Sequence, residues 1–398
     1  MKSQRQNLRG RGRESGLTHG GGQGSRPGRM IAKALSPLLS AALLAGCATG
    51  LGPKAIHSER PDYNQQIVRS GDEQMLLNLV RLRYNDSPLF LELGSVVASY
   101  DYGVAANASG QINTPGPTGQ ANLGAGLTYS EHPTITYTPL TGDQFAERML
   151  SPIPLNSMML FSQSGWSVER LFLLAVLRIN DLYNAISVTG PTPRHKPAYE
   201  PFLEFTRHFR ELQRAGLIGL DWERKGRDTN APAHDPRLWI RLPADTNTPL
   251  AAEALAVHRA LSLPTDRTEF TLTGYPYGRG PTEVGIRCRS LMGILYFLST
   301  AVQPPAPHLA EGLITITKDE QGQPFDWTKF TGEVLRIHSQ KERPASAAVA
   351  VKYRGWWFYI ADNDQNSKIT FSLLNTLFQL QATSGSGKSP VLTLPVGG

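Results

Sequence analysis

Ser167 has the neighbours that come closest to those of a catalytic nucleophile. The run Gly165-Trp166-Ser167 begins like the tight turn that exposes a nucleophilic serine, but that turn needs a second glycine two residues after the serine. Glu169 stands there instead, and its side chain would crowd the turn. We therefore expect Ser167 to cap the N-terminus of a helix and not to attack a substrate.

Metal-ligand patterns are incomplete in the same way. Residues 362–366 (Asp-Asn-Asp-Gln-Asn) begin like a calcium loop, but Ser367 stands at its glycine position and Leu373 at the position of its bidentate acid. We expect a polar turn before a helix there. The nine histidines show no HxxxH, HxH or HExxH spacing, which argues against a zinc site. The prediction is no metal and no organic cofactor.

Cys288 and the carboxylates offer no catalytic set either. Cys288 lies in the run 283–289, and no pattern of His or acid is present to activate its thiol, so we expect a small buried residue in a strand. No pair of carboxylates stands out for glycoside chemistry. A non-enzymatic protein is therefore the leading expectation, and a cell-wall or glycan-acting enzyme is an alternative.

Cys47 carries the clearest chemical prediction. A short basic segment, residues 30–33, precedes an apolar run of eleven residues, 34–44, and then the small residues Ala45 and Gly46. The run is too short to span a bilayer as a helix and has the form of a secretory signal. We expect cleavage between Gly46 and Cys47.

The sequence around this cleavage point, Leu44-Ala45-Gly46-Cys47, resembles the lipobox of bacterial lipoproteins. The resemblance implies diacylglycerol on the thiol, three acyl chains in a Gram-negative cell, and a lipid bilayer as the partner of Cys47. Ala48 stands where an aspartate would imply retention in the inner membrane. An outer-membrane protein on the periplasmic face is therefore expected, and exposure on the cell surface stays open. An ordinary signal peptide with a chance cysteine is the alternative.

Residues 1–46 also account for the excess of positive charge. They hold eight of the 40 basic residues and one of the 33 acidic residues, which leaves 32 of each in residues 47–398. Because binding to a phosphate backbone needs a net basic footprint, we expect no nucleic-acid partner. Residues 1–29 are rich in Arg and Gly without apolar periodicity, which indicates a disordered extension before a leader that starts at Met30.

Two stretches of strict alternation lie within residues 89–138. Apolar and aromatic residues recur at every second position from Val96 to Ala108 and from Ala121 to Tyr129, with mostly small or polar residues between them. Residues 109–120 separate the stretches and are rich in Pro and Gly. Period-two patterning on both sides of a turn predicts a long antiparallel hairpin.

Two interpretations of this hairpin stay open. One of its faces can cover the core of the domain, as in many antiparallel sheets. Alternatively, residues 95–130 can enter the outer membrane, because strands of about ten residues with one apolar face suffice to cross a bilayer. Entry requires a closed ring of identical subunits, since a single hairpin leaves unpaired edges in lipid. The candidate membrane-facing residues are Val104, Leu123, Leu127 and Tyr129.

The remaining patterns indicate an α+β fold with an N-terminal helix and long hairpin, a helical middle, and a mixed C-terminal sheet with helices. We expect helices at 62–84, 141–150, 168–185, 199–215, 250–261, 291–300 and 367–381. We expect strands at 217–222, 238–242, 269–272, 283–289, 313–317, 334–338, 347–353 and 356–360. The expected regions are 1–46 (extension and signal), 47–60 (lipidated tether), 61–150 (helix and hairpin), 151–265 (mainly helical), 266–383 (α+β) and 384–398 (flexible tail).

The densest aromatic cluster lies at residues 353–359, after a predicted hairpin turn at Arg354-Gly355. One face of the strand that follows is expected to belong to the core. The other face could bind an envelope protein or a cell-wall sugar, because aromatic side chains are enriched at interfaces. The candidate contact residues are Trp356, Trp357 and Tyr359. Burial of both faces is the alternative.

Residues 76–86, 353–362 and 367–374 resemble segments of hypothetical lipoproteins from Gram-negative genomes. The resemblance covers most of residues 47–398 and implies a location in the cell envelope, without an activity or a catalytic residue. The sequence thus predicts an outer-membrane-anchored lipoprotein that acts by binding or assembly. A homo-oligomeric pore subunit that inserts its hairpin is the alternative.

Overall fold

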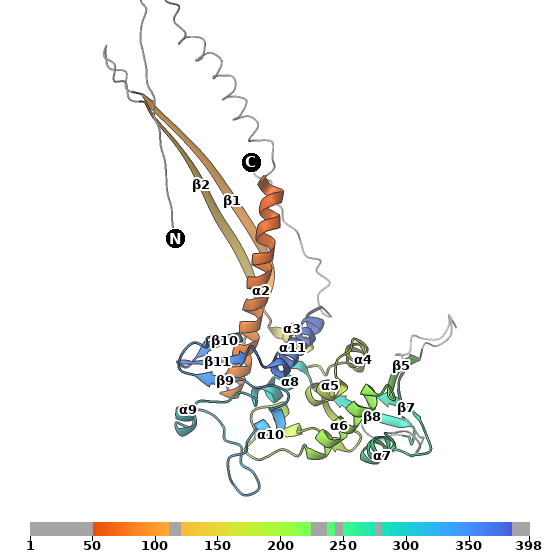
Figure 1. Ribbon diagram of the computed structural model, residues 1–398. Coiled ribbons are helices and arrows are strands. Elements are labelled where there is room, and N and C mark those ends of the chain that lie inside the picture. Colours follow the sequence, from red (N-terminus) through yellow and green to blue (C-terminus); the bar gives the residue numbers. More distant parts are fainter. Residues whose placement is uncertain (1–50, 111–120, 224–236, 243–249, 275–279, 384–398) are drawn as a thin grey trace, which may run out of the picture. The chain divides into compact units, whose positions relative to one another are not determined.

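Helix α2 (Leu51–Arg83) and the strands β1 (Leu91–Gly110) and β2 (Ala121–Pro139) form the first part of the chain shown in Figure 1. The computed structural model describes residues 51–110, 121–223, 237–242, 250–274 and 280–383. The chain divides into two units, Met1–Gln66 and Ile67–Gly398. All contacts discussed below lie within the second unit. Its mixture of helices and small antiparallel and mixed sheets confirms the α+β class.

Short helices and strands alternate through the rest of the chain. The first group is α3 (Gly142–Phe145), a π-helical turn (Ala146–Leu150), α4 (Leu155–Gln163), α5 (Val168–Ala175), β3 (Val176–Ile179), β4 (Leu182–Tyr183), a 3₁₀ turn (Ile186–Thr189), α6 (Glu200–Arg214), β5 (Gly219–Glu223), β6 (Arg237–Arg241) and α7 (Ala251–Ala260). The second group is β7 (Glu269–Thr273), β8 (Glu283–Cys288), α8 (Leu291–Ser299), α9 (Ala306–Ala310), α10 (Thr328–Thr331), β9 (His338–Gln340), β10 (Ala347–Tyr353), β11 (Trp356–Ala361) and α11 (Gln365–Thr383).

Three sheets organise these strands. A six-stranded sheet has the order β4-β3-β8-β7-β6-β5, in which β7 and β8 are parallel and the other neighbours are antiparallel. A three-stranded antiparallel sheet has the order β10-β11-β9, and β1 pairs with β2 in a separate two-stranded sheet. The six-stranded sheet takes strands from both sides of residue 265. The predicted division between a helical middle and an α+β end therefore does not separate two folding regions.

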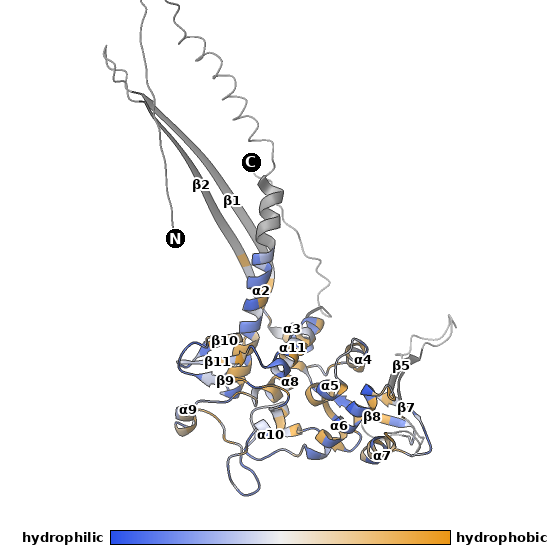
Figure 2. Cartoon of the chain, viewed as in Figure 1, coloured by the Kyte–Doolittle hydropathy of each residue, from blue (hydrophilic) through white to orange (hydrophobic). Residues whose placement is uncertain are grey.

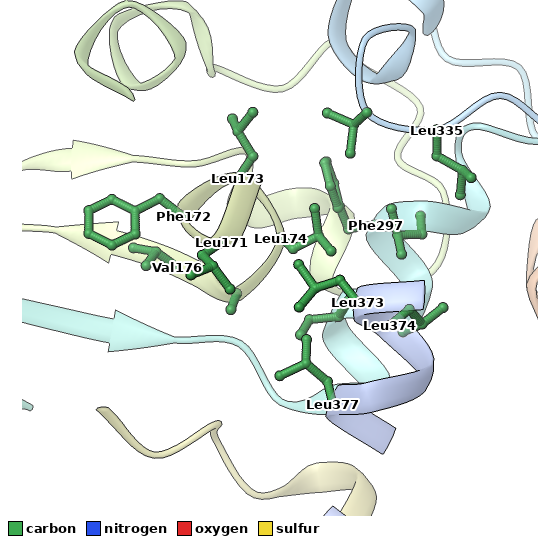
Figure 3. Packing of buried hydrophobic residues seen from close by; sticks show 14 of the residues in the cluster. Leu171, Phe172, Leu173, Leu174, Val176, Phe297, Leu335, Leu373, Leu374 and Leu377 are labelled. Atoms are coloured by element: carbon green, nitrogen blue, oxygen red, sulfur yellow. The ribbon is translucent and has the colours of Figure 1, made fainter. Parts of the chain in front are cut away.

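The core lies where α5, α8 and α11 meet. Helix α8 is almost wholly apolar, and all but one of its residues are buried. Figure 3 shows leucines of α5 and α11 pointing into the same interior region as Phe297 of α8; they include Leu171, Leu174, Leu373, Leu374 and Leu377. Burial of one such side chain stabilises the fold by about 1.5–3 kcal/mol. These long-range contacts connect elements that lie up to about two hundred residues apart in the sequence.

The C-terminal half of α2 is amphipathic, as its three- and four-residue apolar spacing predicted. Its buried side chains include Leu76, Leu79 and Val80, and Figure 2 shows hydrophilic residues alternating with them along this part of the helix. Asn85 ends the helix with a φ of 58°, a left-handed conformation that Asn tolerates better than most residues. The helix was predicted to end at residue 84, and it ends one residue earlier, at Arg83.

Helix α5 ends without a glycine or a loop and runs directly into β3. Arg289, on the chain just after β8, holds this junction: its Nη1 donates to the carbonyls of Leu173, Leu174 and Val176 at 3.0–3.1 Å. The Asn184 side-chain amide donates to the Val176 carbonyl at 2.7 Å as well. The last carbonyls of a helix need such donors when water cannot reach them.

The helix predicted over 168–185 is therefore wrong after Ala175. Residues 176–179 form a strand because they pair with β8, and Val176 and Ile179 are β-branched residues that suit a strand. The sequence contains no Gly or Pro to signal the change. Ser167 does cap α5, since its Oγ accepts the backbone N–H of Arg170 at 3.4 Å.

Other local predictions differ from the structure in smaller ways. The strand predicted over 313–317 is a loop, and the one predicted over 334–338 gives only the short strand β9 from His338 onward. Helix α4 was not predicted. Helix α2 begins at Leu51 and so includes most of the predicted tether. These are short segments, whose conformation depends on tertiary contacts more than on local propensity.

Helix α11 begins earlier than predicted because its cap is Asp364. The Asp364 Oδ1 accepts the backbone N–H of Ser367 at 3.1 Å, and the Ser367 hydroxyl donates to Asp364 Oδ2 at 2.7 Å. The predicted start at residue 367 is two residues too late. Ser367 is instead buried and accepts the backbone N–H of Arg336 at 2.8 Å.

Candidate functional site: the β1–β2 hairpin and its anchor

Strands β1 and β2 pair in antiparallel register from Leu91 and Pro139 at the base to Gly110 and Ala121 near the tip. The predicted hairpin is thus present, and it is longer than the ten-residue arms expected from the sequence. The tip, residues 111–120, lies outside the described residues.

The register brings the apolar positions of the two strands to one face. Residues directly opposite each other in an antiparallel pair stand on the same side of the sheet. Val104 is opposite Leu127, and Tyr102 is opposite Tyr129. The candidate residues Val104, Leu123, Leu127 and Tyr129 therefore occupy positions on one face. The opposite face has small or polar residue types; its cross-strand pairs near the tip are Ser109–Asn122, Asn107–Gly124, Ala105–Gly126 and Gly103–Thr128.

A β-bulge at Gly94 extends the apolar face to the base of the hairpin. Leu93 is opposite Tyr137, whereas Ser95 is opposite Thr136, so β1 carries one residue more than β2 at this point. A side chain at Gly94 would meet the Thr136 carbonyl oxygen at 3.4 Å, which is tight. The extra residue puts Leu93 on the same face as the even-numbered apolar residues of β1 above it.

This face is uncovered where the structure describes its side chains. Leu93, Ile135 and Tyr137 are 39%, 42% and 46% exposed. In the described part of the chain no third strand pairs with β1 or β2. The outer edges of the hairpin beyond its base therefore keep rows of backbone N–H and C=O groups without strand partners.

Two amide side chains of α2 bind the base of the hairpin. The Asn78 amide donates to the Leu89 carbonyl at 2.8 Å and accepts the Leu89 N–H at 3.0 Å. The Gln74 amide does the same for Leu91, at 3.1 Å and 2.7 Å. Gln74 and Asn78 lie four residues apart on the helix, and their partners Leu91 and Leu89 lie two residues apart on the extended chain. Each amide forms the two hydrogen bonds that a neighbouring strand would otherwise form.

Gln74 and Asn78 were not among the residues predicted from the sequence. A signal was present: two amides at i and i+4 on the buried side of a helix, shortly before a strand whose edge has no other partner. Arg148 adds an ion pair with Glu92 close to the same base. The Asn375 amide of α11 donates to Asp72 Oδ1 at 2.6 Å, and burial is the main cause that raises the pKa of Asp72. The two amides thus fix the start of β1 to α2, the Arg148 pair joins it to the π-helical turn, and the Asn375 bond joins α11 to α2.

The three rings of the predicted aromatic surface do not share one face of β11, because side chains alternate along a strand. Arg354 and Gly355 both have positive φ, 46° and 79°, which confirms the tight turn before the strand. Trp357 and Tyr359 then lie on one face, whereas Trp356 lies on the face of the buried Phe358. All three candidate rings are half-buried.

Each candidate ring also has a neighbour on the segment 338–343. The Lys341 Nζ lies 5.1 Å from the Trp356 ring centre, the Arg343 Cζ lies 5.4 Å from that of Trp357, and the His338 ring lies 5.5 Å from that of Tyr359. Each cation–π contact at an exposed site contributes about 0.5–1 kcal/mol to the stability of the fold. The three rings thus contribute to the packing of their own sheet.

A polar cluster joins the end of α2 to the β10–β11 turn. Tyr353 donates a hydrogen bond to Asp86, and the Arg354 Nη2 binds the same carboxylate oxygen at 2.9 Å. The Tyr84 hydroxyl lies 2.6 Å from His308 Nδ1. Burial raises the pKa of Tyr84 to about 12 and lowers the pKa of His308, so both are neutral at pH 7. The cluster is a bridge between elements and holds no activated nucleophile.

We expect Asp86→Asn to lower the stability at neutral pH by less than about 1 kcal/mol, because the pair is partly exposed to solvent. The hydrogen bond from Tyr353, followed by Arg354, lowers the pKa of Asp86 below its usual 3.8. The contribution is therefore present above pH 3.8 and is lost as the pH falls through the lowered value. Urea unfolding at pH 7 and pH 3 checks this: the difference from the native chain should shrink at pH 3. Asp266→Asn, in an exposed loop, serves as the control, and an equal difference at both pH values would contradict the expectation.

The other residues that were considered for catalysis or metal binding have structural roles. Ser167 is a helix cap, residues 362–364 form the turn before α11, and Asp362 pairs with Lys368 at 2.8 Å. Cys288 is a buried thiol of β8, and burial raises its pKa to about 12. Within the described ranges, no group of three or more His, Cys, Asp or Glu side chains could hold a metal ion.

The predicted cleavage and lipidation residues, Gly46 and Cys47, lie outside the described residues, as does the tail 384–398. Among the helices that the structure describes, none combines the length and the apolar character needed to cross a bilayer. The chain matches no protein-family model, no curated protein and no solved structure.

Proposed function

We propose that this chain is a lipid-anchored protein of the outer membrane that acts by assembly and not by catalysis, and that copies associate through the β1–β2 hairpin. The observation that carries the proposal is the register, which gathers the apolar positions of both strands on one face, while no strand in the described part of the chain pairs with the outer edges. The lipid anchor rests on the leader that ends at Cys47.

The unpaired edges favour assembly. A two-stranded sheet is marginally stable alone in water, and an open edge is a template for another strand. A second copy of this chain offers two edges of the same length and the same alternation. Association of hairpins edge to edge would join their apolar faces into one continuous surface.

Only part of the hairpin would reach the hydrocarbon of a membrane. At about 3.3 Å per residue, the 20 residues of β1 extend for roughly 65 Å, about twice the hydrocarbon thickness. The half toward the tip, residues 102–110 and 121–129, contains no charged residue, whereas Asp101 and Glu131 lie just below it. The Tyr102–Tyr129 pair stands at this boundary, as aromatic residues do at membrane surfaces.

A pore is the specific form of assembly that this pattern favours. The face opposite the apolar one carries Gly, Ser, Asn and Thr in the half toward the tip, which suits contact with water. In lipid, all backbone groups must be paired, so the hairpins would have to close into a ring. Assembly outside the bilayer, against an envelope protein or the cell wall, is the alternative.

We expect the detergent-extracted protein to form ring-shaped particles and heat-sensitive oligomers of high mass on gels. The double change Leu123→Asp and Leu127→Asp should abolish both, because each charge placed in hydrocarbon costs about 2–4 kcal/mol. Negative-stain images and gel mobility measure the effect. Labelling of single cysteines at positions 104, 123 and 127 with a lipid-phase reagent tests whether the face meets lipid.

The matched control is Asn122→Asp with Thr128→Asp, which adds the same charges to the opposite face of the same strand. This variant should still assemble. A native protein that is a monodisperse monomer without detergent, once its lipid is removed, would contradict the proposal. Rings that form without lipid-phase labelling would support assembly and reject the pore.

A further inference from the structure

Strands β1 and β2 contain acidic residues but no Lys or Arg. In the sequence, neither basic residue type occurs anywhere between Arg83 and Arg148, although Lys and Arg make up 40 of the 398 residues in the chain. Three acidic residues, Glu92, Asp101 and Glu131, lie on the two strands. The fixed charges of the paired strands are therefore all negative, and fixed charges of one sign are what sorts ions in a channel.

The register assigns Asp101 and Glu131 to different faces of the hairpin. Position 101 lies two residues from Gly103 on the same strand, so it belongs to the polar face. Position 131 is opposite Tyr100 and therefore belongs to the apolar face. The two acidic residues stand in neighbouring pairs of the ladder, and of these two it is Asp101 that occupies the face expected to meet water in a pore.

Two other positions of the polar face hold residues that can carry a charge. Glu92, near the base of the hairpin, forms an ion pair with Arg148. His132 is opposite Ser99, and an ordinary histidine is neutral at pH 8. At that pH, Asp101 is therefore the charged residue of the polar face to which neither strand and no residue at the base supplies a cation in the sequence between Arg83 and Arg148.

The assembly proposed above would repeat this position around a ring. Each copy would bring one Asp101 to the same height, beside the Tyr102–Tyr129 pair at which the uncharged half of the hairpin begins. From there toward the tip, the described strands contain no charged residue that could oppose it. A ring of carboxylates lowers the electrostatic energy of a cation and raises that of an anion, and such rings make channels selective for cations.

We propose that the pore formed by the hairpins conducts cations in preference to anions, and that Asp101 determines this selectivity. The inference rests on the proposed function, because a chain that forms no pore has no such ring. It adds the class of solute that passes, which is small hydrated cations such as K⁺. Anions are disfavoured twice, since the ring repels them and the strands offer no Lys or Arg to bind them.

The test is single-channel recording of the detergent-extracted full chain in planar lipid bilayers, with a KCl gradient at pH 8. The reversal potential gives the permeability ratio of K⁺ to Cl⁻, and we expect a ratio of about five or more for the native chain. Asp101→Asn should bring this ratio close to one, and Asp101→Lys should reverse the preference. Because salt screens a charge over about 10 Å at 0.1 M and about 3 Å at 1 M, the native ratio should fall between these concentrations.

The matched control is Glu131→Gln, which removes the same charge from the neighbouring pair on the opposite face. It should leave the ratio unchanged. Negative-stain images show whether each variant still forms rings. If an Asp101 variant does not assemble, the salt dependence of the native ratio decides the question, since a ratio that does not change with salt excludes a wall charge as its cause.

The outcomes separate this inference from the proposed function. A native ratio near one, or a ratio that stays the same in both Asp101 variants, would overturn the inference and leave the pore standing. Rings of the native chain that conduct no ions would reject the pore and the selectivity together. Loss of the preference in Glu131→Gln as well as in Asp101→Asn would show that the face assigned by the register does not matter, and would also overturn the role given to Asp101.

Discussion

Replacing Cys47 with alanine should abolish incorporation of labelled palmitate and reduce the mature, membrane-bound protein at least about tenfold. In the proposed lipoprotein the thiol accepts the lipid, and each buried methylene of an acyl chain contributes about 0.8 kcal/mol to membrane attachment. The unprocessed precursor should accumulate in place of the mature form. Metabolic labelling, gel mobility and fractionation of the cell envelope measure the three effects.

Cys288→Ala is the matched control for this experiment, because it removes the chain's other cysteine. That thiol is buried in β8, so we expect normal lipidation and only a small loss of stability. If Cys47→Ala were processed and attached to the membrane like the native chain, the chain would not be a lipoprotein anchored at this residue.

Arg289→Met should lower the free energy of unfolding by about 3–5 kcal/mol, since several buried carbonyls would lose their donor at once. The guanidinium binds the Leu173, Leu174 and Val176 carbonyls and also that of Asn184. It lies 4.8 Å from the centre of the Phe297 ring as well. Urea unfolding followed by circular dichroism measures the loss.

Arg287→Met provides the comparison for this variant, because Arg287 lies on the same strand, β8, with an exposed side chain. It should change the stability by less than about 0.5 kcal/mol. Arg289→Lys keeps the charge but not the planar fork, and an intermediate loss is expected. Equal unfolding midpoints for Arg289→Met and the native chain would show that Arg289 does not stabilise the junction between α5 and β3.

The elements that the sequence predicted correctly are those whose residues carry a strong local pattern. Helix α6 has a regular apolar face and a Gly216 stop, and both hairpins have period-two alternation with a recognisable turn. Strand β3 has no such local pattern. Its conformation depends on pairing with β8 and on the hydrogen bonds that Arg289 donates. No local signal in residues 168–185 marks that change.

The candidate site was predictable in its outline. Alternation identified the hairpin and assigned Val104, Leu123, Leu127 and Tyr129 to one surface, and the register agrees with that assignment. The anchor formed by Gln74 and Asn78 was not predictable, because an amide gives no sign of its partner in sequence. A cavity that Arg83 and Trp327 line together was not predictable either, since its wall comes from segments more than two hundred residues apart.

The bulge at Gly94 makes this residue the place where β1 can change its length without changing the faces of the hairpin. Deleting Gly94 would leave Leu93 opposite Tyr137 and Ser95 opposite Thr136, so the strands would pair regularly and the apolar face would be kept. Deleting one residue higher in either strand would instead place apolar positions of one strand beside polar positions of the other, because side chains alternate with a period of two. Away from Gly94, insertions and deletions of one residue are therefore expected to be more harmful than substitutions, and changes of two residues in each strand to be tolerated.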